Sequence, residues 1–449
     1  MQSANQVPDA AGTAPPRANV HGHLLWAGCD VVELAERYGT PLYVFDEGII
    51  RDRCRAYHAG FAGYTGGVAV AYAAKAILTR AIARLMALEG MHLDIVSGGE
   101  LHVALHGGFP AERMVMHGNN KTASELAMAV AVGVGRIVVD NVHELDLLRR
   151  VTERRRDGAR QRVLLRVAPG IEAHTHDYIR TGSQDSKFGF DLQSGQVTEA
   201  AMRVAATSGL ELVGLHAHIG SQILDVAAIQ PLVQTMLDLV VDIRRHVPGV
   251  AAELNLGGGL GIQYRDEQAL PPAEFVGAIV QAVRDGCAGR GLPLPRIMVE
   301  PGRSIVGDAA VALYRVGAQK RVPGLMPYIA LDGGMGDNIR PALYGAEYAA
   351  VLANRRVPAD AVLEPVHLVG RYCESGDFLA KAIPLPPLEA GDLIAIPAAG
   401  AYQYPMSSNY NLVPKPCVLL ASAGEAHVMV KRETYEDLLA RDRLPAHLE

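Results

Sequence analysis

The stretch AVAYAAKAILTR, residues 69–80, places a single lysine directly after an apolar segment. The run 68–72 contains only valine, alanine and tyrosine, as expected of a buried strand, and Lys75 follows its carboxyl end. An ammonium group in apolar surroundings has a lowered pKa and can form an imine with an aldehyde. The alternative for Lys75 is an ordinary ion pair with a nearby acid. Lys75 is therefore a candidate nucleophile whose role depends on its neighbours.

Two later apolar runs lead into residues that could bind an anionic ligand with a flat ring. The run 212–218 ends at His218, and Ser221 follows it in HAHIGSQI. Another run leads into NLGGGLG, residues 255–261, whose glycines let backbone N–H groups approach an anion closely. The loops after the last two strands of a parallel barrel commonly bind phosphate, although a glycine run alone can equally form a tight turn.

The run 296–300 ends in VEPGR and supplies Glu300 and Arg303. In a parallel barrel the carboxyl ends of all strands face one rim, so a lysine, an imidazole, a glycine loop and a carboxylate would meet there. Pyridoxal 5'-phosphate has the matching parts: an aldehyde, a ring face, a phosphate and a basic pyridine nitrogen. The alternative for Glu300 is a structural role, capping a turn or pairing with Arg303.

Eight apolar runs alternate with segments of helical period between residues 67 and 300. They span 68–72, 92–96, 113–117, 136–140, 162–167, 212–218, 253–256 and 296–300. Eight near-even units favour an α/β fold with a closed (β/α)8 barrel over a doubly wound open sheet. Beyond residue 305, apolar runs separated by Gly, Pro and Asp predict a mainly antiparallel β domain. The expected organisation is a disordered tail at 1–22, a segment joining the β domain at 23–44, the barrel at 45–304 and the β domain at 305–449.

Composition narrows the class of protein. The net charge is −6 without a basic stripe, and no apolar run reaches the ~18 residues of a membrane span, so we expect neither a nucleic-acid nor a membrane partner. Five widely spaced cysteines argue against a disulfide framework or a zinc site and favour a reducing cytoplasm. His174 and His176 have a spacing that is not enough to indicate a metal.

Ten motifs together resemble the diaminopimelate decarboxylases, a family of fold-type III pyridoxal-phosphate enzymes related to ornithine decarboxylases and alanine racemases. The motifs are YAAKA, LDIVSGGEL, HGNNK, SKFGF, HAHIGSQ, GGGLG, EPGR, IRPALYG, CESGDFL and GAYQYPMSSNYN, and the similarity covers nearly everything after about residue 30. The resemblance implies decarboxylation of meso-2,6-diaminopimelate to L-lysine and CO2, the last step of lysine biosynthesis, by a homodimer with shared active sites.

The resemblance also implies a set of cofactor contacts. Lys75 would hold pyridoxal phosphate covalently, His218 would stack on its ring, and Glu300 would keep the pyridine nitrogen protonated. A protonated ring is the strong electron sink that decarboxylation needs, whereas an alanine racemase has an arginine at this position. Further contacts are expected at Asp94, Ser221, Gly257, Gly258, Gly259, Gly302, Arg303 and Tyr402.

By the same resemblance, the substrate would be selected mainly by the C-terminal half. Arg303, Arg340 and Tyr344 match positions that bind its distal carboxylate, and guanidinium groups suit that task, although each arginine could instead be structural. Cys373, brought from the partner subunit, would donate a proton to the carbanion, and Glu374 would bind the distal ammonium group. The alternative for Cys373 is a buried, inert thiol, and the alternative for Glu374 is a solvated acid on the surface.

Tyr402 would contact both cofactor and substrate, or else is an ordinary interface aromatic residue. Three positions depart from the family pattern: Ile77, the pair Arg371–Tyr372 and the stretch 403–405 (Gln-Tyr-Pro). The last two border the substrate pocket of the family. A related decarboxylase acting on ornithine, lysine, arginine or a carboxylated polyamine therefore stays an alternative, as does a catalytically silent cofactor-binding homologue. The carboxylate-binding arginines argue against the first, and the intact lysine, carboxylate and thiol against the second.

Overall fold

The computed structural model describes residues 18–171, 186–248, 250 and 253–448. Most of the predicted tail lies outside these residues, as do His174 and His176. The chain divides into two compact units, which we describe separately. The barrel unit comprises residues 51–262 and 268–305, and the β unit comprises residues 1–50, 263–267 and 306–449.

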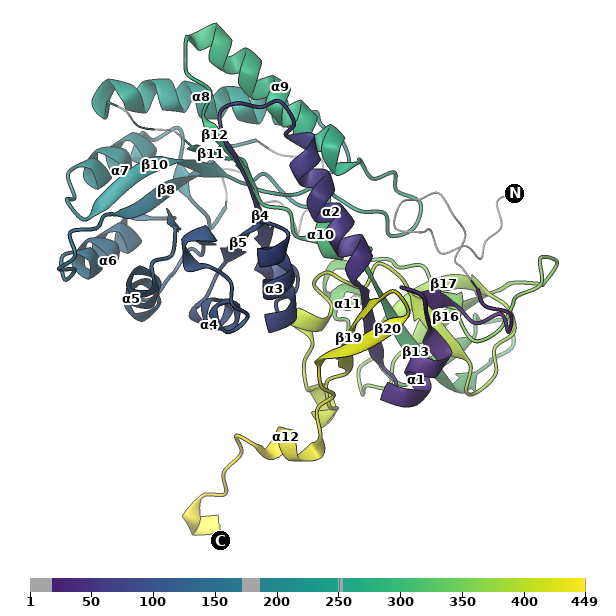
Figure 1. The fold of residues 1–449 in the computed structure, drawn as a ribbon. Coiled ribbons are helices and arrows are strands. Elements are labelled where there is room, and N and C mark those ends of the chain that lie inside the picture. Colours follow the sequence, from purple (N-terminus) through teal and green to yellow (C-terminus); the bar gives the residue numbers. More distant parts are fainter. Residues whose placement is uncertain (1–17, 172–185, 249, 251–252, 449) are drawn as a thin grey trace. The chain divides into compact units, whose positions relative to one another are not determined.

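The barrel unit contains a closed ring of eight parallel strands (Figure 1). They are β4 (Val68–Ala73), β5 (His92–Ile95), β6 (Met114–Met116), β7 (Arg136–Val139), β8 (Gln161–Ala168), β10 (Leu210–Ala217), β11 (Glu253–Asn255) and β12 (Arg296–Val299). The ring closes because β12 pairs with β4 and β10 pairs with β8, while the short β9 (Phe190–Asp191) adds to β8. The predicted barrel is confirmed, and each strand overlaps the apolar run that predicted it.

Helices lie on the outside of this ring (Figure 1). They are α3 (Arg80–Leu88), α4 (Gly98–His106), α5 (Ala123–Val132), α6 (Val142–Thr152), α7 (Gln196–Ala205), α8 (Ile229–His246) and α9 (Pro272–Arg290). The short turns η1 (Ala74–Ala76) and η2 (Ala111–Arg113) follow or precede barrel strands, α10 (Arg303–Val306) follows β12, and α2 (Glu47–Gly60) begins in the β unit and ends in the barrel unit. Four of the outer helices begin at a capping side chain, Thr79, Ser97, Thr122 or Asn141. Each cap contributes about 1 kcal/mol and fixes where a rim loop ends.

The β unit is built around a mixed sheet in the order β17-β16-β14-β13-β3-β19-β20, with β18 and β15 alongside β13. Its strands are β3 (Leu42–Asp46), β13 (Ala310–Lys320), β14 (Tyr328–Leu331), β15 (Val351–Leu352), β16 (Glu364–Val369), β17 (Phe378–Leu385), β18 (Leu393–Ile396), β19 (Cys417–Ser422) and β20 (Glu425–Val430). Most pairs are antiparallel, as predicted, but β14 pairs with β16, and β3 with β19, in parallel.

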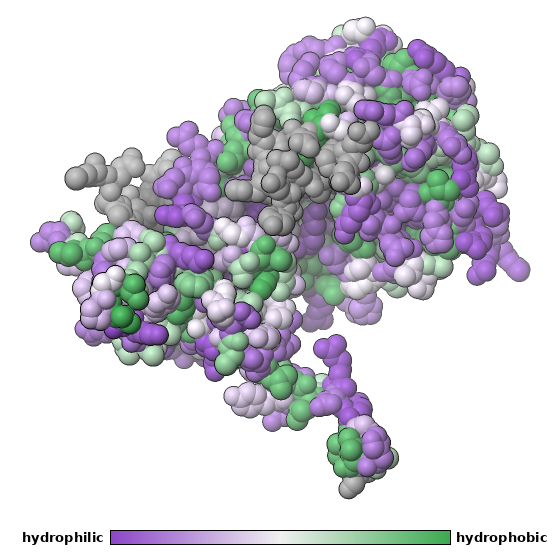
Figure 2. Space-filling view, turned by 180° about the vertical axis from the view of Figure 1, so that it is seen from behind, coloured by the Kyte–Doolittle hydropathy of each residue, from purple (hydrophilic) through white to green (hydrophobic). Residues whose placement is uncertain are grey.

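Smaller elements complete the β unit: β1 (Leu25–Trp26), β2 (Cys29–Asp30), α1 (Val31–Tyr38), α11 (Arg340–Tyr344), η4 (Tyr404–Met406), η5 (Tyr410–Leu412), α12 (Tyr435–Leu439) and η6 (Ala446–Leu448). A buried apolar core joins β3, β13, β18 and β19. Apolar residues are exposed at the C-terminal end, in and beyond α12 (Figure 2). Among the described residues, no helix is long and apolar enough to cross a membrane.

A buried ion pair ties two rim loops of the barrel together. The Nζ atom of Lys121, after β6, lies 2.8 Å from Oε1 of Glu144 in α6, and both side chains are almost fully buried. Nζ also donates to the carbonyl oxygens of Gly118 and Val138, at 2.7 and 2.8 Å, so all three of its protons are used. Burial lowers the pKa of Lys121 and raises the pKa of Glu144. Removing either member of this pair would therefore leave the other as a buried charge without a counter-charge, which destabilises the folded state.

Replacing Lys121 with methionine should lower the free energy of unfolding by about 3–5 kcal/mol, because Glu144 is left buried without its counter-charge. The loss should shrink as the pH falls, because Glu144 can then take up a proton. Urea unfolding followed by circular dichroism measures both effects. The control Arg149→Met breaks an exposed pair with Glu153 on the same helix and should cost less than about 1 kcal/mol. Equal losses in the two variants would show that the buried pair is no more important for stability than an exposed one.

Candidate functional site

A cavity of about 170 Å³ lies at the rim of the barrel, where the strands end. Five predicted residues meet in its wall: Lys75, Asp94, His218, Gly258 and Glu300. The wall also contains Val96, His117, Gly118, Arg166, Phe188 and His216, which were not predicted as site residues. The rim of the barrel unit therefore brings together an amine, carboxylates, imidazoles and a glycine backbone, as the barrel topology predicts.

Glu300 is the buried centre of this cavity. Its Oε1 accepts hydrogen bonds from Nε2 of His117 at 2.7 Å and from Nδ2 of Asn255 at 2.6 Å, and its Oε2 accepts one from Nε2 of His216 at 3.1 Å. Burial alone would raise the pKa of Glu300, but the two histidines hold it well below its usual range. Glu300 is therefore a carboxylate at neutral pH, held by side chains from three other strand ends.

The pKa values of the two histidines beside Glu300 are shifted in opposite directions. Burial opposes protonation of His117, but Asp94 and Glu300 raise its pKa above the ordinary value. Burial lowers the pKa of His216 to about 4 in spite of Glu300. The ligand atoms of His117, His216 and Glu300 lie within 4.8 Å of one another, as in some metal sites, but the two direct contacts have the lengths of hydrogen bonds.

Asp94 is buried at the end of β5, 3.7 Å from Nε2 of His117. Burial raises its pKa, and Glu300 adds to this effect. Its Oδ1 has no hydrogen-bond partner among the described residues. A buried carboxyl oxygen without a donor favours binding of a ligand that brings one.

Lys75 lies in η1, directly after β4, and is exposed at the rim. The expected apolar enclosure of Lys75 is therefore wrong. Its charge acts on Asp94 and on His218, whose pKa is held well below its usual value by burial, by Lys75 and by Arg166. His218 is thus a neutral imidazole. Its Nδ1 accepts a hydrogen bond from the backbone N–H of Gly258 at 3.3 Å.

The glycine loop packs too closely for any side chain. A Cβ atom would lie 2.7 Å from the Ala217 oxygen at Gly257, 2.0 Å from the Glu300 oxygen at Gly258, and 2.6 Å from the Gly220 oxygen at Gly259. Gly257 and Gly259 also have positive φ angles, of 68° and 115°. The bare backbone of this loop is therefore required to bring the ends of β10, β11 and β12 together.

The remaining predicted cofactor residues of the barrel unit lie beside this loop and strand. Ser221 Oγ accepts a hydrogen bond at 3.0 Å from Nη2 of Arg303, which is buried at the start of α10. A Cβ atom at Gly302 would lie 3.0 Å from that of Ala73 in β4. The site thus contains the amine of Lys75, the ionised carboxylate of Glu300, the neutral imidazole of His218 and the glycine loop. These groups match the aldehyde, ring nitrogen, ring face and phosphate of pyridoxal phosphate.

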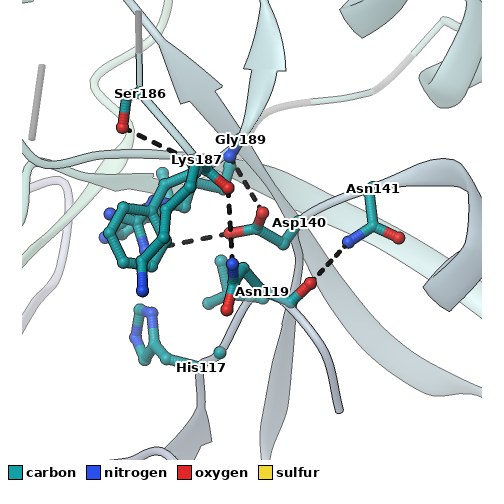
Figure 3. Close-up of polar contacts among 12 residues, drawn as sticks. His117, Asn119, Asp140, Asn141, Ser186, Lys187 and Gly189 are labelled. Atoms are coloured by element: carbon teal, nitrogen blue, oxygen red, sulfur yellow. Dashed lines mark hydrogen bonds and ion pairs between the residues drawn. The ribbon is translucent and has the colours of Figure 1, made fainter. Parts of the chain in front are cut away.

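A polar network holds the segment 186–190 against the rim (Figure 3). Oδ1 of Asp140 accepts a hydrogen bond from the N–H of Gly189 at 2.9 Å. The amide of Asn119 donates to the Lys187 oxygen at 3.5 Å, and Asn141 donates to the Asn119 oxygen at 2.8 Å. These residues follow β6 and β7, so two strand ends position a segment that follows β8.

Arg166 connects this network to the cavity. It lies 3.8 Å from Oδ2 of Asp140, and its guanidinium group stacks 4.2 Å from the centre of the Phe188 ring. Sequence reasoning missed Arg166 and His117, although each lies within or next to a strand end. The signal available was the presence of polar residues in the motif HGNNK and at the end of the apolar run 162–167.

In the β unit, Arg340 is buried among phenols. Its Nε donates to the hydroxyl of Tyr348 at 2.9 Å, and its guanidinium group lies 5.4 and 5.6 Å from the rings of Tyr344 and Tyr402. Tyr402 has an unusual positive φ of 61°. Three of the predicted substrate residues therefore lie together, and a guanidinium among hydroxyl groups suits an anionic guest.

Cys373 and Glu374 are exposed in the β unit, whereas the other four cysteines are buried. The loop that carries them is shaped by Asp377, which accepts hydrogen bonds from the N–H groups of Tyr372 and Met335 at 2.8 and 2.6 Å. The Cys373 N–H donates to Oδ1 of Asn411 at 3.0 Å. The alternative of a buried thiol at Cys373 is therefore wrong for this chain.

Residues 47–307 match the family described as "Pyridoxal-dependent decarboxylase, pyridoxal binding domain". The chain is 48% identical to the diaminopimelate decarboxylase of Bacillus subtilis over 95% of its own length and 96% of that protein. It is 45% identical to that of Mycobacterium tuberculosis over 92% and 93%. The crystal structure of diaminopimelate decarboxylase from M. jannaschii in complex with L-lysine aligns with a TM-score of 0.89 at 34% identity, over 97% of this chain and 99% of that one.

The matched region contains the complete barrel unit, and the full-length similarity includes the β unit. Lys75, Glu300 and the glycine loop lie within the part of the chain that matches the pyridoxal-binding domain. The chain therefore belongs to the pyridoxal-dependent decarboxylases, in the branch that contains the diaminopimelate decarboxylases.

Proposed function

We propose that the protein removes CO2 from meso-2,6-diaminopimelate and forms L-lysine, with pyridoxal phosphate attached to Lys75. The observation that carries this proposal is the presence of Lys75 and an ionised Glu300 in the wall of one cavity. An acid beside the pyridine nitrogen favours decarboxylation, and the diaminopimelate decarboxylases among the relatives support the choice of substrate.

Pyridoxal phosphate, when bound, supplies the electron sink that accepts the electron pair left by the departing CO2. Glu300 would keep a proton on the ring nitrogen, because its negative charge stabilises the protonated ring and its own pKa is too low for it to take that proton. His218, a neutral imidazole, offers a flat face to the ring. The glycine loop, with Ser221, would bind the phosphate.

Arg340 and Tyr344, with Arg303, bind the distal carboxylate of the substrate, and Glu374 binds its distal ammonium group. As CO2 leaves, the carbon that loses it takes one proton, which the thiol of Cys373 supplies and later recovers from water. Tyr402, whose ring centre lies 5.6 Å from the guanidinium group of Arg340, would order the substrate end of the site.

The exposure of Cys373 and Glu374 leaves both side chains accessible to a second copy of the chain. We propose a homodimer in which each chain completes the partner's site with these two residues. The exposed Tyr435, Leu439 and Leu448 near the C-terminus provide apolar surface suited to such a contact.

Five free cysteines, four of them buried, support a cytoplasmic location.

Purified protein supplied with pyridoxal phosphate should release CO2 and lysine from meso-2,6-diaminopimelate. The proposed site binds the distal carboxylate of this substrate, and the other carboxylate leaves as CO2. Gas release and chromatography of the product measure this reaction. Lys75→Ala should lose both the turnover and the visible absorbance of the covalently bound cofactor. Brisk turnover of ornithine or arginine without any turnover of diaminopimelate would contradict the proposed substrate.

Arg340→Ala should lower kcat/KM for diaminopimelate about 10- to 100-fold, the scale of a lost charge-assisted hydrogen bond, with cofactor absorbance unchanged. Steady-state kinetics measure the effect. The matched control Arg321→Ala removes an exposed arginine that pairs with Glu364 in the same unit and should leave kcat/KM unchanged. Equal kinetics for the two variants would remove Arg340 from substrate binding.

Cys373→Ala should keep the cofactor but lower kcat at least about 100-fold, because protonation of the reacting carbon loses its acid. Absorbance and single-turnover kinetics separate binding from chemistry. Cys417→Ala, at a buried thiol in the same unit, should retain near-normal kcat. Normal kcat in the Cys373 variant would show that another group donates the proton.

A further inference from the structure

Asn255, at the end of β11, contacts two parts of the candidate site with one side chain. It is fully buried. Its Nδ2 donates to Oε1 of Glu300 at 2.6 Å and lies 3.2 Å from Sδ of Met298. Its Oδ1 accepts a hydrogen bond from the N–H of Gly257 at 3.0 Å. The amide therefore links the buried carboxylate to the first residue of the glycine loop.

These contacts form a closed ring of hydrogen bonds. The N–H of Gly257 donates to Asn255, Asn255 donates to the side chain of Glu300, and the N–H of Glu300 donates to the Gly257 oxygen at 2.7 Å. Gly257 has a positive φ and no room for a side chain, so the loop cannot easily adjust by itself. Displacement of the amide would move both the loop and the carboxylate.

Asn255 also decides how the oxygens of Glu300 are used. An ionised carboxylate has about four acceptor positions. Oε1 receives both His117 and Asn255, whereas Oε2 receives His216 alone. Asn255 therefore saturates one oxygen and leaves the spare acceptor capacity of Glu300 on the other.

We infer that Asn255 is a positioning residue that couples Glu300, the partner of the cofactor's ring nitrogen, to the glycine loop that binds its phosphate. The inference rests on the proposed function for the identity of the cofactor. It assigns Asn255 no contact with substrate or cofactor. Because one amide positions both Glu300 and the glycine loop, a change at residue 255 can affect binding of the ring nitrogen and of the phosphate together.

Two variants separate the two ends. Asn255→Asp keeps an acceptor for the N–H of Gly257 but replaces the donor to Glu300 with a carboxylate, whereas Asn255→Ala removes both contacts. The control Gln161→Ala removes a buried amide that donates to Val134 and Arg162 at the far end of the barrel strands. Melting temperatures of the cofactor-free proteins report the purely structural cost of each change.

Dissociation constants for pyridoxal phosphate and for pyridoxal, which lacks the phosphate, test the coupling by absorbance titration. Asn255→Asp should weaken both ligands equally, by about 10-fold or more, because only the ring end is affected. Asn255→Ala should weaken pyridoxal phosphate more than pyridoxal. Gln161→Ala should lower the melting temperature without changing either constant.

Unchanged dissociation constants in both Asn255 variants, or losses matched by Gln161→Ala, would overturn the inference and leave only a structural role. So would equal losses of the two ligands in Asn255→Ala. An unmodified protein that binds pyridoxal phosphate but does not act on diaminopimelate would contradict the proposed function alone, since the coupling is measured by binding.

Discussion

The candidate site depends on one buried negative charge, the carboxylate of Glu300. A carboxylate in a protein interior is stable only when hydrogen bonds and opposite charge compensate its lost hydration. His117, His216 and Asn255 provide that compensation from three other strand ends. The two histidines also hold the pKa of Glu300 low, which is the property that a partner for a protonated ring nitrogen needs. The side chains that make burial of Glu300 possible therefore also keep it ionised for its proposed role.

Barrel closure makes this arrangement possible. Residues far apart in the chain meet because β12 pairs with β4 and β10 pairs with β8. The rim loops are then kept short by helix caps such as Thr79 and Asn141, and joined by the buried pair of Lys121 and Glu144. The network of Asp140 and Arg166 adds the segment 186–190 to the same rim. These contacts surround the cavity at the rim of the barrel unit.

The sequence alone predicted the barrel strands well, because a strand buried on both faces is a continuous apolar run. It also predicted that Lys75, shortly after one such run, and Glu300, at the end of another, would meet at the rim. It could not predict the contacts of His216 and Asn255 with Glu300, because these depend on the register between strands that are distant in the chain. For the same reason the parallel pairing of β3 with β19 was missed: an apolar run does not specify its partner.

The position of β3 has a consequence for the order in which the chain can fold. The strand Leu42–Asp46 leaves the ribosome early, yet its two neighbours in the sheet, β13 and β19, are made much later. The barrel strands, by contrast, are contiguous in the chain and can pair as soon as residue 299 has emerged. During translation the apolar strand β3 therefore remains without its sheet partners until β13 and then β19 have been made, so the sheet of the β unit can be completed only after nearly the whole chain has been synthesised.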